Sequence, residues 1–352
     1  MRLPRHFLSE QPDRPTGLSA AFGIHAMLVK WNARESMMSS RRVAGSGRIL
    51  LSAVVLATAC GSRGINSPER DAGGRQVIEH GGRERSYVLR VPTVATVGRT
   101  RVPLVLVLHG GGGNGANAES MTGFTAKARS EGFIVAYPEG TARGRIPLLT
   151  WNAGHCCGYA MNEEVDDVGF LGALIDTLSS RYPVDPRRVY VTGMSNGAMM
   201  SHRVGRELPD RIAAIAPVVG ALFGDEASRG PGVSAVMING VLDNSVPYNG
   251  GMPGGRFTGS WDGTPVRPAV YQATFWANAN ACDPEPTVVE AEMYIHLRHQ
   301  CPAPVAVELY AVKDNGHAWP GGQRGSAVGD APSNALNATD VIWAFFASHP
   351  KH

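Results

Sequence analysis

The alternation of apolar runs with helical patterns is the feature that most constrains the fold of this chain. Residues 102–110 (VPLVLVLHG) and 133–140 (FIVAYPEG) are continuous apolar runs, as expected for strands buried on both faces of a sheet. Residues 118–132 and 166–183 carry helical patterns, and the first ends at Gly132. Strands separated by helices pair in parallel, because the helix returns the chain across the sheet. The sequence therefore predicts an α/β three-layer sandwich with a mostly parallel central sheet and helices on both faces.

The same alternation continues to the C-terminal end. Residues 85–92 are expected to form an edge strand, and residues 248–265, rich in Gly and Pro, a functional surface loop. Further strands are predicted at 188–195, 212–220, 233–240 and 305–312, and further helices at 196–208, 267–281 and 337–350.

The N-terminal part reads as a targeting segment. Three arginines precede the apolar run 49–59 (ILLSAVVLATA), which stops at Cys60. This order is typical of a signal peptide, and the run is too short to span a bilayer. Cys60 after Ala-Thr-Ala resembles a bacterial lipoprotein signal, in which that cysteine is lipidated, and plain secretion is the alternative. A buried core helix is disfavoured, because the polar residues 61–74 follow directly.

These features divide the chain into four parts. Residues 1–36 show no targeting pattern and are interpreted as an N-terminal extension caused by a start codon placed too early. Residues 37–60 are the predicted signal peptide, 61–80 a linker, and 81–352 one catalytic domain. The expected location is extracellular or at the cell envelope, with membrane contact only through a lipid anchor on Cys60.

Four cysteines remain after Cys60, and an even number in an exported chain suggests disulfides. Cys282 and Cys301 flank one segment and are predicted to pair. Cys156 and Cys157 are adjacent, so a bond between them is sterically demanding, and their pairing is left open. The spacing of the cysteines fits no zinc pattern, so we expect no metal site.

The charge distribution excludes one class of partner. Lys and Arg number 33 against 30 Asp and Glu, which gives a formal net charge of +3. The basic residues are scattered apart from a thin cluster before the apolar run at 49–59. No basic patch is therefore available for nucleic acid.

Residues 193–197 (GMSNG) contain a Gly-x-Ser-x-Gly pattern. In a chain with 43 glycines the pattern alone is weak. Its context is more specific, because it follows a predicted strand and opens a predicted helix, the position of a nucleophile elbow. Gly193 and Gly197 allow a sharp turn, and a helix N-terminus favours negative charge near the serine oxygen. Ser195 is therefore the predicted nucleophile, and a structural serine in a tight turn is the alternative.

A serine nucleophile needs a base and an orienting acid, which follow it in this type of fold on loops after strands. Asp243 follows the predicted strand 233–240, and His317 follows the predicted strand 305–312. We predict Asp243 as the acid and His317 as the base. The competing residues have less suitable positions, either away from strand ends or inside a helix or turn: Asp225, Asp262, Asp314, His202, His296 and His299.

Acyl transfer also needs donors for the developing oxyanion. The backbone N–H of Asn196, directly after the nucleophile, is one predicted donor. The second is expected from residues 109–114 (HGGGGN), with Gly111 as first choice and Gly112 as second. A flexible turn is the alternative, and a phosphate-binding loop is disfavoured because its Lys and Ser/Thr are absent.

Five motifs occur together in this chain and are more specific than Gly-x-Ser-x-Gly alone. They lie at residues 109–114 (HGGGGN), 151–158 (WNAGHCCG), 165–170 (VDDVGF), 184–200 (VDPRRVYVTGMSNGAMM) and 316–322 (GHAWPGG). The set resembles the secreted poly(3-hydroxybutyrate) depolymerase family, which is related to feruloyl and acetylxylan esterases, and the resemblance spans about residue 80 to the C-terminal end.

The resemblance implies an α/β-hydrolase fold and Ser195, Asp243 and His317 as the catalytic triad. It also implies that Trp151 and Trp319 lie near the substrate cleft, and a core aromatic is the alternative for either residue. Many members of the family carry a Cys at the position of Gly111, which leaves the partner of Cys156 or Cys157 open.

The sequence thus predicts an exported serine esterase that cleaves carboxylic esters through an acyl-enzyme. The expected substrate is a polyester oligomer or an acylated polysaccharide, and no cofactor is expected. Two alternatives remain: a catalytically inactive surface protein that binds glycans or partners, and a peptidase or thioesterase on the same fold.

Overall fold

The computed structural model describes residues 74–97, 100–144, 148–230, 232–255 and 258–351. The predicted extension, the signal segment with Cys60 and most of the predicted linker lie outside these residues. Within them the chain forms one ten-stranded sheet. Its strands are β1 (Arg75–His80), β2 (Arg83–Arg90), β3 (Val102–Leu108), β4 (Ile134–Pro138), β5 (Val184–Met194), β6 (Ala214–Val218), β7 (Ser234–Gly240), β8 (Thr287–Glu290), β9 (Tyr294–His299) and β10 (Val307–Val312).

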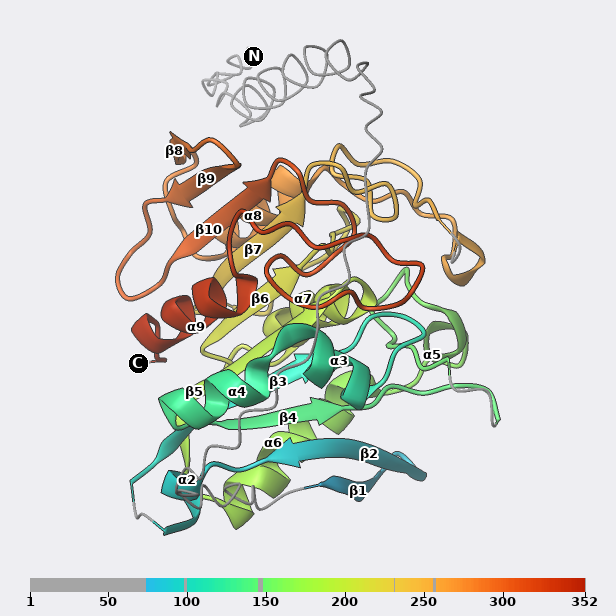
Figure 1. Ribbon diagram of the computed structural model, residues 1–352, viewed down its shortest axis with the longest axis vertical. Helices are drawn as coiled ribbons and strands as arrows, with labels where there is room; N and C mark the ends of the chain where they lie inside the picture. Colours follow the sequence, from blue (N-terminus) through green and yellow to red (C-terminus); the bar gives the residue numbers. More distant parts are fainter. Residues whose placement is uncertain (1–73, 98–99, 145–147, 231, 256–257, 352) are drawn as a thin grey trace, which may run out of the picture. The chain divides into compact units, whose positions relative to one another are not determined.

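The sheet has a parallel centre and antiparallel flanks. Its strand order is β1-β2-β4-β3-β5-β6-β7-β10-β9-β8 (Figure 1). The pairs from β4 to β10 are all parallel, whereas β1, β2, β8 and β9 pair antiparallel. The predicted mostly parallel centre is confirmed, and it places the carboxyl ends of β5, β7 and β10 on one edge of the sheet.

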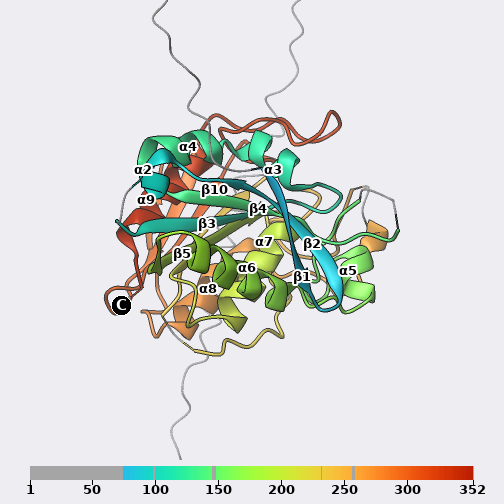
Figure 2. The same ribbon diagram turned by 90° about the horizontal axis from the view of Figure 1, so that it is seen from below.

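Helices cover both faces of the sheet. Figure 2 shows α3, α4 and α9 on one face and α6, α7 and α8 on the other, as predicted. The helices are α2 (Thr93–Val97), α3 (Gly115–Thr122), α4 (Phe124–Glu131), α5 (Gly158–Asn162), α6 (Asp167–Arg181), α7 (Asn196–Glu207), α8 (Ala269–Ala279) and α9 (Ala338–Ser348), with a 3-10 turn at Thr258–Ser260. None of these described helices is long and apolar enough to cross a membrane.

The central strands are buried because their residues are apolar on both sides. Every residue of β3 and β7 is buried, as is every residue of β4 and β6. Such strands cannot face water, so a helix layer has to cover each side of the sheet. The helices supply that cover through apolar stripes, as in α6, where Phe170, Leu171, Leu174 and Leu178 are all buried.

Three expectations are corrected by the described structure. The single helix predicted at 118–132 is two helices, because Gly123 adopts a left-handed conformation (φ 70°) that ends α3 and begins α4. The predicted linker 61–80 contains β1 at its end, since the Gly81–Gly82 turn folds RQVIEH back onto β2. For the same reason β2 lies second in the sheet and is not its edge.

The hairpin β8–β9 extends the sheet beyond the predicted strands. Its sequence signal is weak, because β8 has only four residues and all are exposed. The predicted disulfide Cys282–Cys301 is present, and its two cysteines flank this hairpin. The bond therefore ties the end of α8 to the segment that leads into β10.

A buried polar network joins α7, α8 and β7, which it reaches through the bond from Gln272 Nε2 to Asn239 Oδ1 at 3.2 Å. The imidazole of His202 accepts a hydrogen bond from Trp276 Nε1 at 2.9 Å on Nδ1, and its Nε2 donates to Gln272 Oε1 at 2.7 Å. This arrangement requires the neutral ring with its proton on Nε2. Burial lowers the pKa of His202 to about 3, and the hydrogen bond to Gln272 offsets only part of that effect.

We expect His202 to make stability fall with acidification. Because its folded pKa lies below the unfolded value of about 6.5, the contribution is fully present above that value and is lost as the pH falls toward 3. The variant His202→Gln places an amide, which does not titrate, beside the same partners, Gln272 and Trp276. Urea unfolding of the full chain between pH 4 and 8 should show a slope against pH that is smaller in the variant by up to one proton, about 1.4 kcal/mol per pH unit. Parallel slopes for the two proteins would contradict this assignment.

Candidate active site

The turn between β5 and α7 holds Ser195 in a conformation that few non-glycine residues adopt. Its φ is 57° and its ψ is −121°, a strained combination typical of residues held by their surroundings at functional sites. The backbone N–H of Ser195 donates to the carbonyl of Val218 at 3.0 Å. The turn therefore projects the side chain from the carboxyl edge of the sheet, as a nucleophile elbow does.

Two glycines permit this turn. A Cβ on Gly197 would lie 2.5 Å from the carbonyl oxygens of both Leu108 and His109, and one on Gly193 would lie 2.6 Å from the carbonyl oxygen of Gly197. No side chain fits at either position. The start of α7 consequently lies directly against the end of β3.

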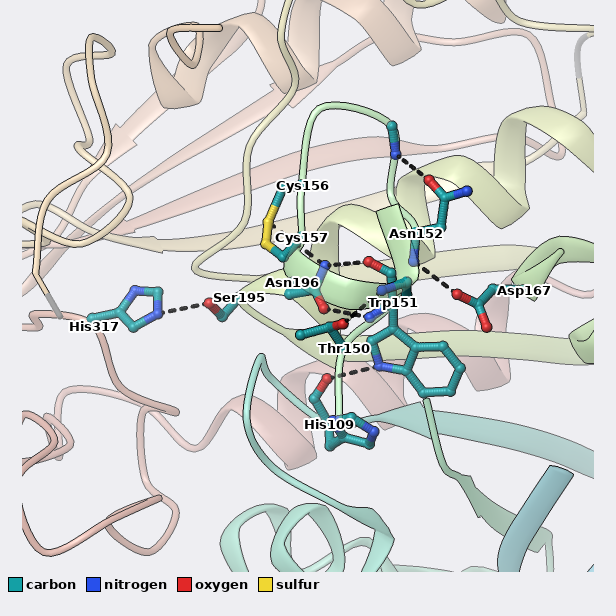
Figure 3. The surroundings of a disulfide bond; sticks show 12 residues. His109, Thr150, Trp151, Asn152, Cys156, Cys157, Asp167, Ser195, Asn196 and His317 are labelled. Carbon is teal, nitrogen blue, oxygen red and sulfur yellow. Dashed lines mark hydrogen bonds between the residues drawn. A yellow bond between two sulfur atoms is a disulfide. The ribbon is translucent and has the colours of Figure 1, made fainter. Parts of the chain in front are cut away.

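Three of the sequence-predicted residues meet at this edge. Nε2 of His317 lies 2.9 Å from Oγ of Ser195, and Nδ1 of His317 lies 2.7 Å from Oδ2 of Asp243. Figure 3 shows the imidazole directed at the Ser195 hydroxyl. The side chains come from the loops after β5, β7 and β10, and Asp243 is almost fully buried. The order and geometry are those of a serine, a base and an orienting acid.

Local hydrogen bonds fix Asp243 and His317 in place. Oδ1 of Asp243 accepts from the backbone N–H groups of Ser245 and Val246, both at 2.8 Å, which leaves Oδ2 for the imidazole. The backbone N–H of His317 donates to Asp330 at 2.6 Å. The buried side chain of Asn315 donates to the carbonyls on either side of His317, those of Gly316 and Ala318.

The competing histidines and acids lie elsewhere. Asp225 and Asp262 both bind His155, at 2.8 and 2.6 Å. Asp262 thereby joins the loop 248–265 to the segment before Cys156, and Asp225 joins the segment after β6 to it. Burial lowers the pKa of His155, but the hydrogen bonds that its ring donates to Asp262 and Asp225 outweigh this effect and raise the pKa. The remaining competitors are held by other partners: Asp314 by Ser333, His202 by Gln272 and Trp276, His296 by Glu308, and His299 by the carbonyl of Asp283.

The backbone N–H groups of Gly111 and Asn196, both near Ser195, have no acceptor within the described residues. A Cβ on Gly111 would lie 3.7 Å from the Cβ of Asn196, so the two residues are neighbours. The second-choice donor, Gly112, is excluded because its N–H donates to the carbonyl of Leu149 at 2.8 Å.

The two predicted substrate-contacting tryptophans are core residues in this structure. Trp151 is 0% exposed and packs 5.0 Å from the ring of His109, and Trp319 is 1% exposed and packs edge-on against Phe124. Neither indole presents a face to a ligand. The expectation is corrected because large aromatic rings with one polar N–H are buried when that N–H finds a partner; here the partners are the carbonyl of His109 and the hydroxyl of Thr339.

The adjacent cysteines Cys156 and Cys157 are bonded to each other, which answers the pairing left open by the sequence. Figure 3 places this cystine beside Asn196, and the Asn196 amide nitrogen lies 3.7 Å from the sulfur of Cys156. In the part of the chain that the structure describes, no three His, Cys, Asp or Glu side chains are grouped as a metal site requires.

Sequence reasoning missed the role of three residues, Asp330, Asn315 and His109. His109 is fully buried; its Nδ1 donates to the carbonyl of Gly110 at 2.8 Å and its Nε2 accepts from the N–H of Gly140 at 3.0 Å. Burial lowers its pKa to about 4, so the ring is neutral at pH 7. His109 was visible at the head of the HGGGGN motif, whereas nothing in the local sequence marks Asp330.

Known proteins resemble this chain in both fold and sequence. The structure resembles the acetyl xylan esterase from Aspergillus awamori, with a TM-score of 0.54 at 16% identity over 78% of this chain and 100% of that one. It also matches a structure described as pOPH Native, with a TM-score of 0.50 at 16% identity over 81% of this chain and 90% of that one. The fold is therefore the α/β-hydrolase fold.

Sequence comparison adds the family. The family model for Esterase PHB depolymerase matches residues 85–249. The chain is 31% identical to feruloyl esterase B of Piromyces equi, over 68% of this chain and 44% of that protein, so it spans less than half of that relative. It is also 31% identical to the putative esterase NocK of Nocardia uniformis subsp. tsuyamanensis, over 75% of this chain and 79% of that protein. The chain belongs to the Esterase PHB depolymerase family.

The close approach at Gly197 predicts the sign of the stability change in the variant Gly197→Ala. Helix propensity alone would make Gly197→Ala stabilising by about 1 kcal/mol. We expect instead a loss of about 1–3 kcal/mol in the free energy of unfolding, because the new Cβ would overlap two carbonyl oxygens. Urea unfolding measures the difference.

The control is Gly230→Ala, where a Cβ meets no atom of the described residues within 4 Å. We expect a change within about 0.5 kcal/mol for this variant. A stabilised Gly197→Ala protein would show that the turn can relax away from β3.

Proposed function

We propose that this protein is an exported serine esterase that hydrolyses carboxylic esters through an acyl-enzyme. The observation that carries the proposal is the hydrogen-bonded chain Ser195–His317–Asp243, with the serine on a strained turn at the start of α7. A catalytically inactive binding protein would have no need to hold these three groups in line. The family membership supports ester cleavage in particular.

In the proposed reaction, Nε2 of His317 takes the proton of Ser195 as its Oγ attacks the ester carbonyl carbon. Asp243 accepts the Nδ1–H bond, which holds the ring and stabilises the imidazolium. The N–H groups of Gly111 and Asn196 stabilise the oxyanion of the tetrahedral intermediate. His317 then protonates the departing alcohol oxygen, and an acyl-Ser195 ester remains.

Water completes the cycle by the same steps in reverse. His317 removes a proton from the water as it attacks the acyl carbonyl, the second oxyanion occupies the same N–H pair, and the proton passes to Ser195 as the acid leaves. Every proton in this scheme moves through Nε2 of one imidazole. No metal ion or organic cofactor takes part in the scheme.

The names of relatives indicate two substrate classes. They include a poly(3-hydroxyalkanoate) depolymerase C of Paucimonas lemoignei, 29% identical over 34% of this chain and 28% of that protein, besides the feruloyl esterase. We therefore propose polyester oligomers or acylated polysaccharides as substrates. The two disulfides support export to an oxidising compartment, together with the signal-like residues 37–60.

The Ser195→Ala variant tests the nucleophile. We expect the full chain to hydrolyse p-nitrophenyl acetate and butyrate, and kcat/KM to fall at least about 10⁴-fold in the variant, because triad members act as a unit. A fluorophosphonate probe should label the wild type and leave the variant unlabelled. The control Ser130→Ala, on the exposed side of α4, should keep full activity and labelling. A folded wild type that neither turns over ester nor reacts with the probe would favour the binding-protein alternative.

The Asp243→Asn variant tests the orienting acid. We expect kcat to fall by roughly 10⁴-fold, because an amide can stabilise the wrong tautomer of His317 and cannot stabilise the imidazolium. Asp225→Asn is the matched control, since Asp225 was a competing candidate and instead binds His155. Equal losses in the two variants would show that the acid has been assigned incorrectly.

A further inference from the structure

We propose that Trp151 and the side chain of Asn196 form a brace that holds the two oxyanion donors, the N–H groups of Gly111 and Asn196, at a fixed spacing. The inference rests on the proposed function and assigns Trp151 a positioning role in place of the substrate contact expected from the sequence. Both side chains act by positioning backbone groups, and neither touches the reacting atoms.

The first half of the brace is a two-way hydrogen bond between a side chain and a backbone. The backbone N–H of Trp151 donates to Oδ1 of Asn196 at 2.7 Å, and Nδ2 of Asn196 donates to the carbonyl of Trp151 at 3.0 Å (Figure 3). Asn196 is buried, so both amide ends would lose solvation without these partners. The pair therefore fixes the residue that carries the first oxyanion donor against the segment 150–157.

The second half reaches the loop that carries the other donor. Nε1 of the Trp151 indole donates to the carbonyl of His109 at 3.0 Å, and Figure 3 shows this bond below the pair of bonds between Trp151 and Asn196. That carbonyl belongs to the peptide unit between His109 and Gly110, one unit before the one that carries the N–H of Gly111. The His109 ring also holds the carbonyl of Gly110 through Nδ1. One residue, Trp151, thus contacts the host segments of both donors.

Trp151 can brace other residues because it is itself anchored. Its carbonyl accepts a second hydrogen bond from the N–H of Cys157 at 2.9 Å. The next residue, Asn152, donates its N–H to Asp167 at 2.7 Å, and Asp167 forms a buried 2.6 Å ion pair with Arg85 of β2. The anchor therefore extends from the cystine to the edge region of the sheet.

Such a brace stabilises the transition state more than it stabilises the bound substrate. Donors that lie at the oxyanion position without reorganising stabilise charge only as it develops, so a loosened spacing lowers kcat more than it raises KM. The glycines of 109–114 have no side chains to hold that loop. The hydrogen bond from Trp151 to the neighbouring carbonyl of His109 therefore contributes to the position of the loop. A merely structural tryptophan would affect stability without this split.

The test compares three variants of the full chain with p-nitrophenyl butyrate. We expect kcat to fall about 10-fold in Trp151→Phe, which removes one N–H from a retained aromatic ring, and about 10–100-fold in Asn196→Ala, with KM within about twofold. The matched control is Trp276→Phe, an equally buried indole whose N–H binds His202. It should lower the melting temperature and leave kcat within about twofold.

A second readout isolates the oxyanion. A trifluoromethyl ketone forms a hemiketal oxyanion with an active serine, so its affinity should fall in the two brace variants by the same factor as kcat/KM. In the double variant the fold-loss of ketone affinity should be smaller than the product of the two single losses, because both changes loosen the same spacing between the two donors. If Asn196→Ala does not fold, Trp151→Phe carries the test alone.

The outcomes separate the two proposals. An active wild type whose Trp151→Phe and Asn196→Ala variants keep kcat and ketone affinity overturns the brace and leaves the esterase proposal intact. Losses in Trp276→Phe equal to those in the brace variants also overturn it, since stability would then explain the effect. A folded wild type with no ester turnover overturns both proposals before any brace variant is made.

Discussion

The close contact between the start of α7 and the end of β3 is the constraint on which the rest of this structure depends. Gly197 lies against the carbonyls of Leu108 and His109, and only a residue without a side chain fits there. This contact fixes how near the Ser195 turn comes to the glycine loop after β3. It also explains why a strained φ at Ser195 persists, since the packing on both sides of the turn determines it. Ser195 and the loop of the proposed oxyanion site are therefore neighbours as a result of backbone packing.

Much of the fold follows from local sequence, and much of the site does not. The buried strands β3 and β7 are legible as apolar runs, and parallel topology then brings the residues after β5, β7 and β10 to one edge. The exposed strand β8 has no such apolar run and is therefore not predicted from the sequence. Ser195, Asp243 and His317 could be selected because each lies in the turn or loop that follows a strand. The pairing of Asn196 with Trp151, and of His317 with Asp330, joins residues far apart in sequence and has no local signal.

Several polar groups of the core are buried together with a hydrogen-bond partner. The Arg85–Asp167 pair and the neutral rings of His109 and His202 all lie away from water. Replacing such groups by apolar residues is often neutral or stabilising in other proteins, so stability alone is a weak reason to keep them. Here the ion pair and His109 each bind a backbone group beside the active site, at Asn152 and Gly110. Their geometry suits the precise placement of the backbone at these two positions.

The two disulfides differ in what they do to the unfolded chain. Cys282–Cys301 joins residues 19 apart, and a loop of that size removes enough chain entropy to stabilise the folded protein by about 3 kcal/mol. Cys156–Cys157 joins neighbours that are already connected by one peptide bond, so it restricts the unfolded ensemble very little. Its effect is confined to the native state, where Cys157 binds Trp151. A reducing environment would consequently act on this protein in two separate ways. Loss of Cys282–Cys301 would lower the free energy of unfolding, whereas loss of Cys156–Cys157 would change the native segment that binds Trp151 beside the proposed site.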